Sequence, residues 1–74
     1  MHNWNMSQEI RIKIAKNLEK LRQNIPICKE KLSLALGFDN SYISKLENAK
    51  VNITIDKLNK IAKYFNVDVR DLLN

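Results

Sequence analysis

The sequence predicts an all-α domain, and three observations support this fold class. Apolar residues recur every three or four positions over most of the chain, as they do along one face of an α-helix. The alternation of apolar and polar residues that indicates β-strands is weak throughout. A single glycine and a single proline imply short connections. The length of 74 residues fits one domain, which we place at residues 7–74 behind an N-terminal extension at residues 1–6.

The first two predicted helices occupy the N-terminal half of the domain. The first begins near Ser7 and ends before Pro26, because a proline disfavours the helical conformation of the residue that precedes it. The second resumes at Lys29 and is followed by Gly37, where a left-handed cap residue is expected. The residues expected to face inward are Ile10, Ile14, Leu18, Leu21 and Ile25 in the first helix and Leu32 and Leu36 in the second.

A third helix is predicted over about residues 39–47, with Asp39 as its N-cap and a connection of about three residues before it. Ile43 and Leu46 would face inward, and the outer face would carry Asn40, Ser41, Ser44 and Lys45. Two short helices joined in this way have the layout of a helix-turn-helix, in which the second helix presents its outer face to a groove of DNA.

Two further helices complete the predicted fold. Thr54 is the expected N-cap of the fourth helix, and Asn66 can end it in place of a glycine. Asp68 and Asp71 resemble a weak reciprocal N-terminal cap of a short fifth helix. The apolar residues assigned to these helices are Ile55, Leu58, Ile61, Ala62 and Phe65 in the fourth and Val69, Leu72 and Leu73 in the fifth.

The charge of the chain favours an anionic partner. Thirteen lysines and arginines stand against eight acidic residues, which gives a formal net charge of +5. Most of this excess lies in residues 1–37, with seven basic and three acidic side chains, against six and five in residues 38–74. Nucleic acid is therefore the leading candidate partner, ahead of a membrane surface or an acidic protein.

Several other classes of protein are disfavoured. A domain of this size has little room for a deep catalytic cleft, and the lone His2 has no nucleophile in a recognisable pairing, so we expect no catalytic residues. Cys28 has no disulfide partner, and no Cys/His cluster has zinc-site spacing, so we expect a reducing, cytoplasmic location, no metal and no cofactor. No apolar run reaches the length of a membrane span, so no membrane partner is expected.

The segment Lys29-Glu-Lys-Leu-Ser-Leu-Ala-Leu-Gly-Phe-Asp-Asn-Ser-Tyr-Ile-Ser-Lys-Leu-Glu-Asn resembles the phage-repressor and Cro type of helix-turn-helix, also called the xenobiotic-response-element family. The most specific part of the match is Leu36-Gly37 followed by residues 41–47, and the similarity extends from about Ile10 to Leu73. The resemblance implies a five-helix, lambda-repressor-like domain that binds double-stranded DNA.

Transferred position by position, the resemblance implies two sets of DNA contacts. Chemistry allows asparagine to pair with adenine and lysine to reach guanine, although no base sequence can be read from these residues. The implied base contacts are Asn40, Ser41, Ser44 and Lys45, with a solvated helix face as the alternative. The implied phosphate contacts are Lys29, Tyr42, Asn48, Lys50 and Asn52. Core packing is an equal alternative for Tyr42, and loop solvation is the alternative for the residues after the third helix.

Glu47 is acidic on a surface that should be basic, which calls for a structural reason. It resembles the glutamate that pairs with an arginine of the first helix in this family, here Arg22. A planar guanidinium suits such a partly buried carboxylate. We therefore expect Arg22 and Glu47 to form a structural ion pair that helps to determine the fold.

Besides Lys29, which stands where this family usually has a glutamine, the chain departs from the family pattern at four positions. Cys28 replaces the usual polar cap of the second helix, and we expect a partly buried small side chain there in preference to a redox sensor. Ala49 stands where glycine is common, and Ile53 where proline is common, so we expect the loop at residues 48–54 to differ in shape from that of the family. Ser33 replaces an alanine at a tight helix contact, which is tolerable if its hydroxyl bonds back to a carbonyl. Three further apolar residues could serve a partner or simply be exposed, namely Trp4, Ile12 and Leu34.

The function expected from the resemblance is that of a transcriptional regulator acting as a homodimer on an inverted repeat. One recognition helix covers only a few base pairs, whereas two helices spaced one DNA turn apart read two half-sites. Pairing would use Tyr64 and the end of the chain or the N-terminal arm. The alternative is a helical module that keeps the fold but binds protein or RNA. The absence of acidic residues from Asn40 to Leu46 favours DNA.

Overall fold

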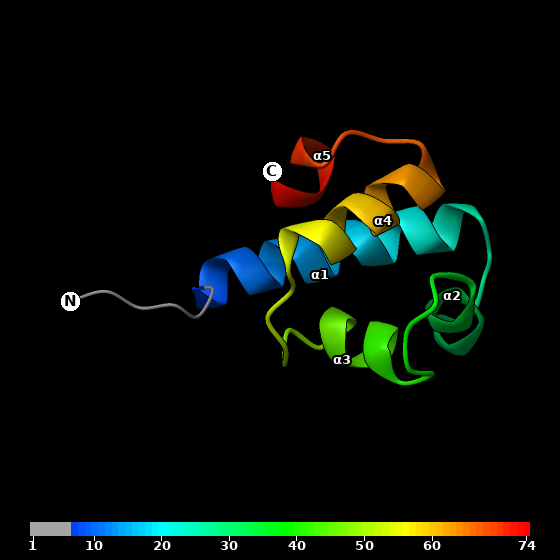
Figure 1. Cartoon of the computed structure of the whole chain (residues 1–74). Helices are drawn as coiled ribbons and strands as arrows, with labels where there is room; N and C mark the ends of the chain where they lie inside the picture. Colours follow the sequence, from blue (N-terminus) through cyan, green and yellow to red (C-terminus); the bar gives the residue numbers. More distant parts are fainter. Residues whose placement is uncertain (1–6) are drawn as a thin grey trace.

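The computed structural model describes residues 7–74, and these residues form five helices without a strand. They are α1 (Gln8–Asn24), α2 (Lys29–Ala35), α3 (Tyr42–Glu47), α4 (Ile55–Phe65) and α5 (Arg70–Leu73). The long helix α1 runs through the middle of the molecule, with α2 and α3 on one side and α5 on the other (Figure 1). The all-α prediction and its five helices are confirmed.

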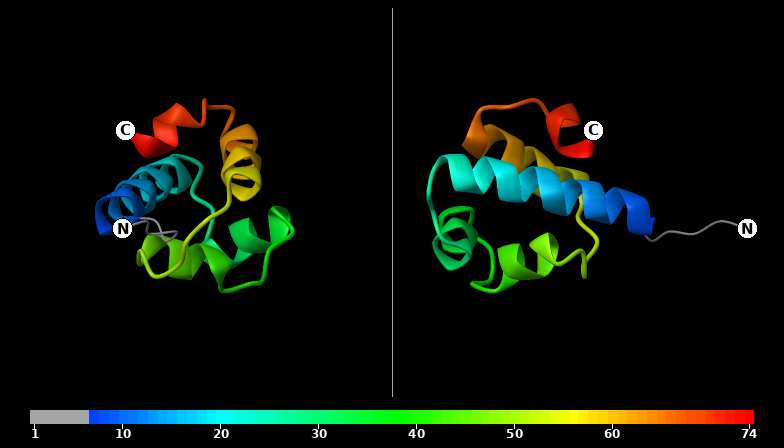
Figure 2. Two further views of the ribbon diagram at one scale, coloured as in Figure 1. Left: turned by 60° about the vertical axis from the view of Figure 1, so that its left-hand side comes forward. Right: turned by 180° about the vertical axis from the view of Figure 1, so that it is seen from behind.

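The hydrophobic core lies where the inward faces of all five helices meet. Its completely buried members are Ile14, Leu18, Leu32, Ile43, Leu58, Ile61 and Leu72. Helix α1 packs against both α3 and α5, and α2 packs against α3. The two rotated views place α1 and α4 between the α2–α3 pair and α5 (Figure 2). The core therefore fixes α3 at one edge of the molecule, with its outer face turned away from the other helices.

Four residues assigned to inward faces from their spacing are exposed instead. Ile10 and Ile25 stand near the two ends of α1, Ile55 is the first residue of α4, and Leu73 is the last residue of α5. Helical spacing gives the direction of a side chain around the axis, but burial also requires a neighbouring element at that height along it. At these helix ends the neighbouring elements do not cover the predicted face, and the prediction of burial is wrong there.

The polar cap predicted for α4 is present, and α1 has a polar cap at Ser7, the residue near which it was predicted to begin. The Ser7 hydroxyl accepts the N–H of Ile10, and the Thr54 hydroxyl accepts the N–H of Lys57, both at 3.2 Å. Before α5, the Asp71 carboxylate accepts the N–H of Asp68. Each of these bonds satisfies a backbone donor that has no partner inside its helix.

Helix α3 begins later than predicted. The α-helix starts at Tyr42, so the connection from α2 extends from Leu36 to Ser41 and is longer than the three residues expected. The Asp39 carboxylate accepts the backbone N–H of Ser41 at 3.2 Å, and the Asp39 carbonyl accepts that of Tyr42 at 3.0 Å. Asp39 therefore stabilises a turn that leads into α3, and Asn40 and Ser41 belong to this turn.

Within residues 7–74, three helices end in a left-handed residue with the hydrogen bonds of a Schellman motif. After α2, Gly37 has φ +78°, and Phe38 N–H donates to the Ser33 carbonyl. After α4, Asn66 has φ +57°, and Val67 N–H donates to the Ala62 carbonyl. Glycine and asparagine adopt this conformation at low steric cost, as their positions in the sequence predicted.

The third left-handed residue is Ala49, which follows α3 at φ +57°. Its N–H donates to the Leu46 carbonyl, and Lys50 N–H donates to the Lys45 carbonyl. The same motif thus ends α3 although Ala49 carries a Cβ atom, and a residue with a Cβ atom is strained in the left-handed region. The glycine that is common at this position is absent, but the loop conformation that needs it is kept.

We expect Ala49→Gly to raise the free energy of unfolding by about 0.5 to 1 kcal/mol, because it removes the strained Cβ at a positive φ. Urea denaturation followed by circular dichroism measures the change. The matched control is Ala35→Gly at the exposed end of α2, where glycine should instead lower stability by a similar amount. If both substitutions lower stability equally, the left-handed residue is not strained.

Candidate nucleic-acid interface

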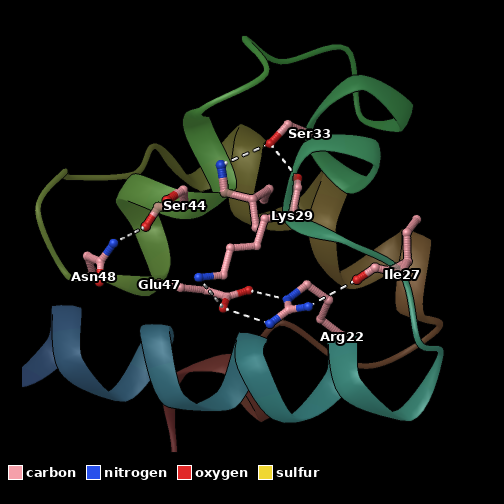
Figure 3. A network of polar contacts seen from close by, with 8 residues as sticks. Arg22, Ile27, Lys29, Ser33, Ser44, Glu47 and Asn48 are labelled. Carbon is pink, nitrogen blue, oxygen red and sulfur yellow. Dashed lines mark hydrogen bonds and ion pairs between the residues drawn. The ribbon is translucent and has the colours of Figure 1, made fainter.

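An ion pair between α1 and α3 fixes the orientation of the candidate recognition helix. The Arg22 guanidinium binds the Glu47 carboxylate in a two-pronged contact, with Nε 2.7 Å from Oε2 and Nη2 3.2 Å from Oε1 (Figure 3). The Glu47 side chain is only 4% exposed and that of Arg22 is 15% exposed. The hydrogen bond to Glu47 raises the pKa of Arg22 above its ordinary value, against the opposing effect of burial.

The same guanidinium also reaches the start of α2. Arg22 Nη1 donates to the carbonyl of Ile27 at 3.1 Å, one residue before the cap of α2 (Figure 3). Lys29, the first residue of α2, extends its side chain toward Glu47, with Nζ 4.0 Å from Oε1. Glu47 of α3 therefore binds Arg22 of α1 and lies near the charged Lys29 at the beginning of α2. Three helices meet at this one carboxylate.

Ser33 joins α2 to the first turn of α3. Its buried hydroxyl donates to the Lys29 carbonyl at 2.9 Å, as expected from the sequence. The same oxygen accepts the backbone N–H of Ile43 at 3.0 Å (Figure 3). This second bond was not predicted. It satisfies an N–H near the start of α3 that has no partner within that helix, and it locks the two helices of the helix-turn-helix together.

The four residues predicted to contact bases lie on the outer side of α3 and of the turn before it. Asn40 and Lys45 are exposed, and Ser41 and Ser44 are partly buried. The Asn40 amide donates to a Glu30 carboxylate oxygen at 3.4 Å, a contact between exposed side chains. The structure thus brings these residues to one face, although Asn40 and Ser41 stand outside the helix itself.

Ser41 is engaged with its neighbour in the turn. Its hydroxyl donates to the Asp39 carboxylate, which also accepts the Ser41 backbone N–H. These bonds favour the charged carboxylate and lower the pKa of Asp39 below its ordinary value. The carboxylate therefore keeps its charge, and its support of the turn, down to lower pH than a free aspartate would.

The residues that follow α3 lie on the same side of the molecule. Asn48, Lys50 and Asn52 are all exposed. The Asn48 amide donates to the Ser44 carbonyl at 2.9 Å and so covers the last turn of α3 (Figure 3). The Asn52 amide oxygen accepts a bond from Arg11 of α1 at 3.4 Å. Sequence reasoning did not single out Arg11, because no local pattern indicates a contact between residues 41 positions apart.

Tyr42 does not offer its hydroxyl to a phosphate in this structure. The oxygen is buried and has no hydrogen-bond partner among residues 7–74, and burial raises the pKa of Tyr42. Its ring meets that of Phe38 edge to face at 4.8 Å between centroids, and Lys57 Nζ lies 4.7 Å from its centre. The packing alternative for Tyr42 therefore fits this placement, and the phosphate alternative would require the side chain to move.

The expectations for Cys28, Leu34 and Ile12 can be compared with the structure. Cys28 is exposed, which contradicts the expected partial burial, and its side chain makes no cap bond to α2. Cys28 is the cap residue that precedes α2, whereas the buried residues of that helix, Leu32 and Ser33, lie further along it. Leu34 and Ile12 are both exposed, Leu34 at 60%. His2 and Trp4 belong to residues 1–6, outside the described part of the chain.

The described residues hold no group of three potential metal-ligating side chains. In the same range, every helix is too short or too polar to cross a lipid bilayer.

We expect Glu47→Gln to lower the free energy of unfolding by about 2 to 4 kcal/mol, because it leaves the largely buried Arg22 charge without its carboxylate. The matched control is Asp68→Asn, which removes the charge of the exposed pair with Arg70 while keeping an oxygen for the cap. That control should change little. Denaturation curves of the two variants measure the difference, and equal losses would mean that the Arg22–Glu47 pair does not determine the fold.

Comparisons with known proteins agree on the fold. A control protein of Bacillus amyloliquefaciens, C.BamHI, is 29% identical over 70 residues, which cover 93% of this chain and 86% of that protein. The crystal structure of a hypothetical transcription factor from Neisseria, NHTF, superposes with a TM-score of 0.84 at 25% identity, over 100% of this chain and 86% of that one. The restriction-modification controller protein C.AhdI of Aeromonas hydrophila gives a TM-score of 0.78 at 25% identity, over 88% of this chain and 94% of that one.

The family assignment rests on most of the chain. A family model described as helix-turn-helix matches residues 12–72, a range that includes every helix from α2 to α4 and most of α1 and α5. The match contains the Arg22–Glu47 pair, the left-handed Gly37 and the exposed face of α3. The chain belongs to the Cro/C1-type helix-turn-helix family of DNA-binding transcription regulators.

Proposed function

We propose that this protein binds a specific double-stranded DNA operator by inserting α3 and the turn before it into the major groove. The observation that carries the proposal is the outer face at residues 40–45, where Asn40 and Lys45 are exposed and Ser41 and Ser44 are partly buried. Asparagine, serine and lysine side chains supply both donors and acceptors for base edges. The residues that we assign to base contact are Asn40, Ser41, Ser44 and Lys45.

Residues around this face are assigned to the DNA backbone. The exposed Lys50 follows α3, and Lys29 at the start of α2 is held near Glu47 by a contact of 4.0 Å that is long enough to be exchanged for a phosphate. Asn48 and Asn52 add neutral donors at the same edge. The formal charge of +5 supports attraction to DNA over distances of a Debye length. Phosphate contacts of this kind set register and affinity, and the base contacts set specificity.

The active form that we propose is a homodimer on an inverted repeat. One copy of α3 reaches only a few base pairs, and two copies about 34 Å apart would read two half-sites one turn apart. Tyr64 at the end of α4 and Leu73 at the end of α5 both have exposed side chains. Helix α5 lies on the side of α1 opposite to α2 and α3. Pairing there would leave both recognition faces available (Figure 1).

The regulated genes that we propose are those of a restriction-modification system. The support is the similarity to C.BamHI, which is named a control protein, and to C.AhdI, which is named a restriction-modification controller. Each similarity extends over more than four fifths of both chains. Such a regulator acts through the position of its operator, so the protein itself needs no catalytic step.

We expect binding to a fluorescein-labelled random duplex to weaken steeply with salt, with a slope of log affinity against log salt of about −0.9 for each phosphate neutralised. Fluorescence anisotropy measures this salt dependence.

Lys45→Ala should weaken operator binding by about 1 to 3 kcal/mol and relax the preference for one base. Its control is Lys63→Ala, which removes the same charge from an exposed residue in the last turn of α4, outside the recognition face. A flat salt response would reject DNA binding and favour a protein-interaction module.

We expect sedimentation equilibrium to detect a dimer that Tyr64→Glu converts to a monomer, because a charge at the pairing surface would have to be desolvated. Ile55→Glu at the opposite end of α4 is the control, and it should leave the dimer intact. The monomeric variant should keep its affinity for random duplex per subunit but lose cooperative binding to the inverted repeat. A wild-type protein that stays monomeric on its operator would contradict the dimer.

A further inference from the structure

The Asn40 side chain contacts a carboxylate of the preceding helix. Its amide Nδ2 donates to Glu30 Oε2 at 3.4 Å, and Glu30 stands in the first turn of α2. No lysine or arginine among residues 7–74 forms an ion pair with Glu30. The charge of Glu30 lies beside the proposed base contacts, where it would repel the phosphates of DNA. An acidic residue at this place therefore calls for a benefit that offsets the repulsion.

The backbone around Asn40 is held by the turn that precedes α3. The Asp39 carboxylate accepts the Ser41 N–H at 3.2 Å, and the Asp39 carbonyl accepts the Tyr42 N–H at 3.0 Å. With the main chain fixed, the direction of the Asn40 amide depends on its side-chain torsions. Rotation about the Cβ–Cγ bond decides whether the amide nitrogen or the amide oxygen faces Glu30. The contact with Glu30 therefore selects the orientation of the amide.

A carboxylate holds an asparagine amide in one orientation only. An ionised carboxylate only accepts hydrogen bonds, whereas the amide has an oxygen that accepts and a nitrogen that donates. Glu30 must therefore face the Asn40 nitrogen, because the amide oxygen in its place would meet another acceptor. The nitrogen carries two hydrogens, so it can donate to Glu30 and to a base at the same time. The held amide thus offers a base one acceptor and one donor, in a fixed order.

This fixed order suits adenine and not guanine. In the major groove adenine presents the N6 donor next to the N7 acceptor, whereas guanine presents two acceptors, O6 and N7. The held Asn40 amide can accept from N6 and donate to N7 of an adenine. Against guanine its oxygen would meet an acceptor, and turning the oxygen away would direct it toward the Glu30 carboxylate. Glu30 therefore penalises the amide orientation that guanine would need.

We propose that Glu30 is a positioning residue that makes Asn40 select adenine over guanine at one position of each half-site. This inference rests on the proposed function, and it adds to the base-reading face a residue of α2 that touches no base itself. Because the carboxylate orients the amide before DNA arrives, less side-chain freedom is lost at the moment of binding. Glu30 thus increases discrimination between bases while it weakens the attraction to every duplex alike.

Two selections from a random-sequence duplex pool find the base pair that Asn40 reads. The wild type gives the operator, and Asn40→Ala identifies the position whose preference disappears. Fluorescence anisotropy then compares two operator duplexes that carry A·T or G·C at that position. The wild type is expected to bind the A·T duplex at least about tenfold more tightly, as one bidentate contact allows. Glu30→Gln should reduce this ratio to about twofold, because a glutamine amide can pair with the Asn40 amide in either orientation.

Glu9→Gln is the matched control for the loss of charge. It removes the same charge from an exposed residue in the first turn of α1. Each of the two variants should tighten binding to a random duplex by about twofold or less, but only Glu30→Gln should change the A·T preference. In the Asn40→Ala background, Glu30→Gln should leave the ratio of the two duplexes near one. A change of the fold would instead weaken the preference at every operator position.

The outcomes separate this inference from the proposed function. The inference is overturned if no position loses its preference in Asn40→Ala, or if the position lost is a G·C pair. It is also overturned if Glu30→Gln keeps the wild-type ratio or weakens the preference at all positions alike. In each of these cases the proposed function stands as long as the wild type binds DNA with a steep salt dependence. If the wild type shows no salt-dependent binding, both fail together.

Discussion

The arrangement of the DNA-binding face depends on one buried carboxylate. Glu47 is the last residue of α3, and its two oxygens bind the guanidinium of Arg22 in α1. Apolar contacts alone leave a helix free to slide or rotate by small amounts, because they are not directional. A two-pronged contact allows neither movement, since both hydrogen bonds must keep their geometry. Arg22 also binds the Ile27 carbonyl, so the beginning of α2 is held by the same group.

The burial of this carboxylate explains why an acidic residue is tolerated on a basic surface. An exposed glutamate beside the recognition helix would repel the phosphates of DNA. Glu47 is almost completely covered, and Arg22 and Lys29 both face it with positive charge. The net field outside the pair is therefore not that of an anion. The Lys29 side chain is partly exposed to solvent and only loosely paired with Glu47. It can therefore also contact a phosphate of the DNA backbone, the role to which we assign it.

Much of the fold follows from local patterns in the sequence, and the exceptions have a common cause. The cap at Thr54 and the left-handed Gly37 and Asn66 depend only on nearby residues, and each was predicted, as was the start of the first helix near Ser7. The late start of α3 was not, because the Asp39 carboxylate, taken as a helix cap, instead accepts the N–H of Ser41 in a turn before the helix. The exposed Ile10 and Ile55 were misassigned because burial depends on elements distant in the sequence.

In the candidate site, too, some contacts could be predicted from the sequence and others depend on how distant elements pack. The Arg22–Glu47 contact was expected from the resemblance to a family, and the back-bond of Ser33 from the chemistry of a hydroxyl in a helix. The bond from Ile43 to Ser33, the approach of Lys29 to Glu47 and the contact of Arg11 with Asn52 all need the relative placement of helices. The buried hydroxyl of Tyr42 is of this kind too, since its cover comes from the packed fold. The assignment of individual residues to bases stays a prediction.

The hydrogen bond between Ser33 and Ile43 has a consequence for how such a protein diversifies. It ties α3 to α2 through a backbone amide, and the outward side chains of Asn40, Ser44 and Lys45 take no part in the hydrophobic core. Substitutions at these surface positions can therefore alter which operator is preferred while the scaffold is inherited unchanged. New binding preferences become accessible in single steps, without passing through poorly folded ancestors.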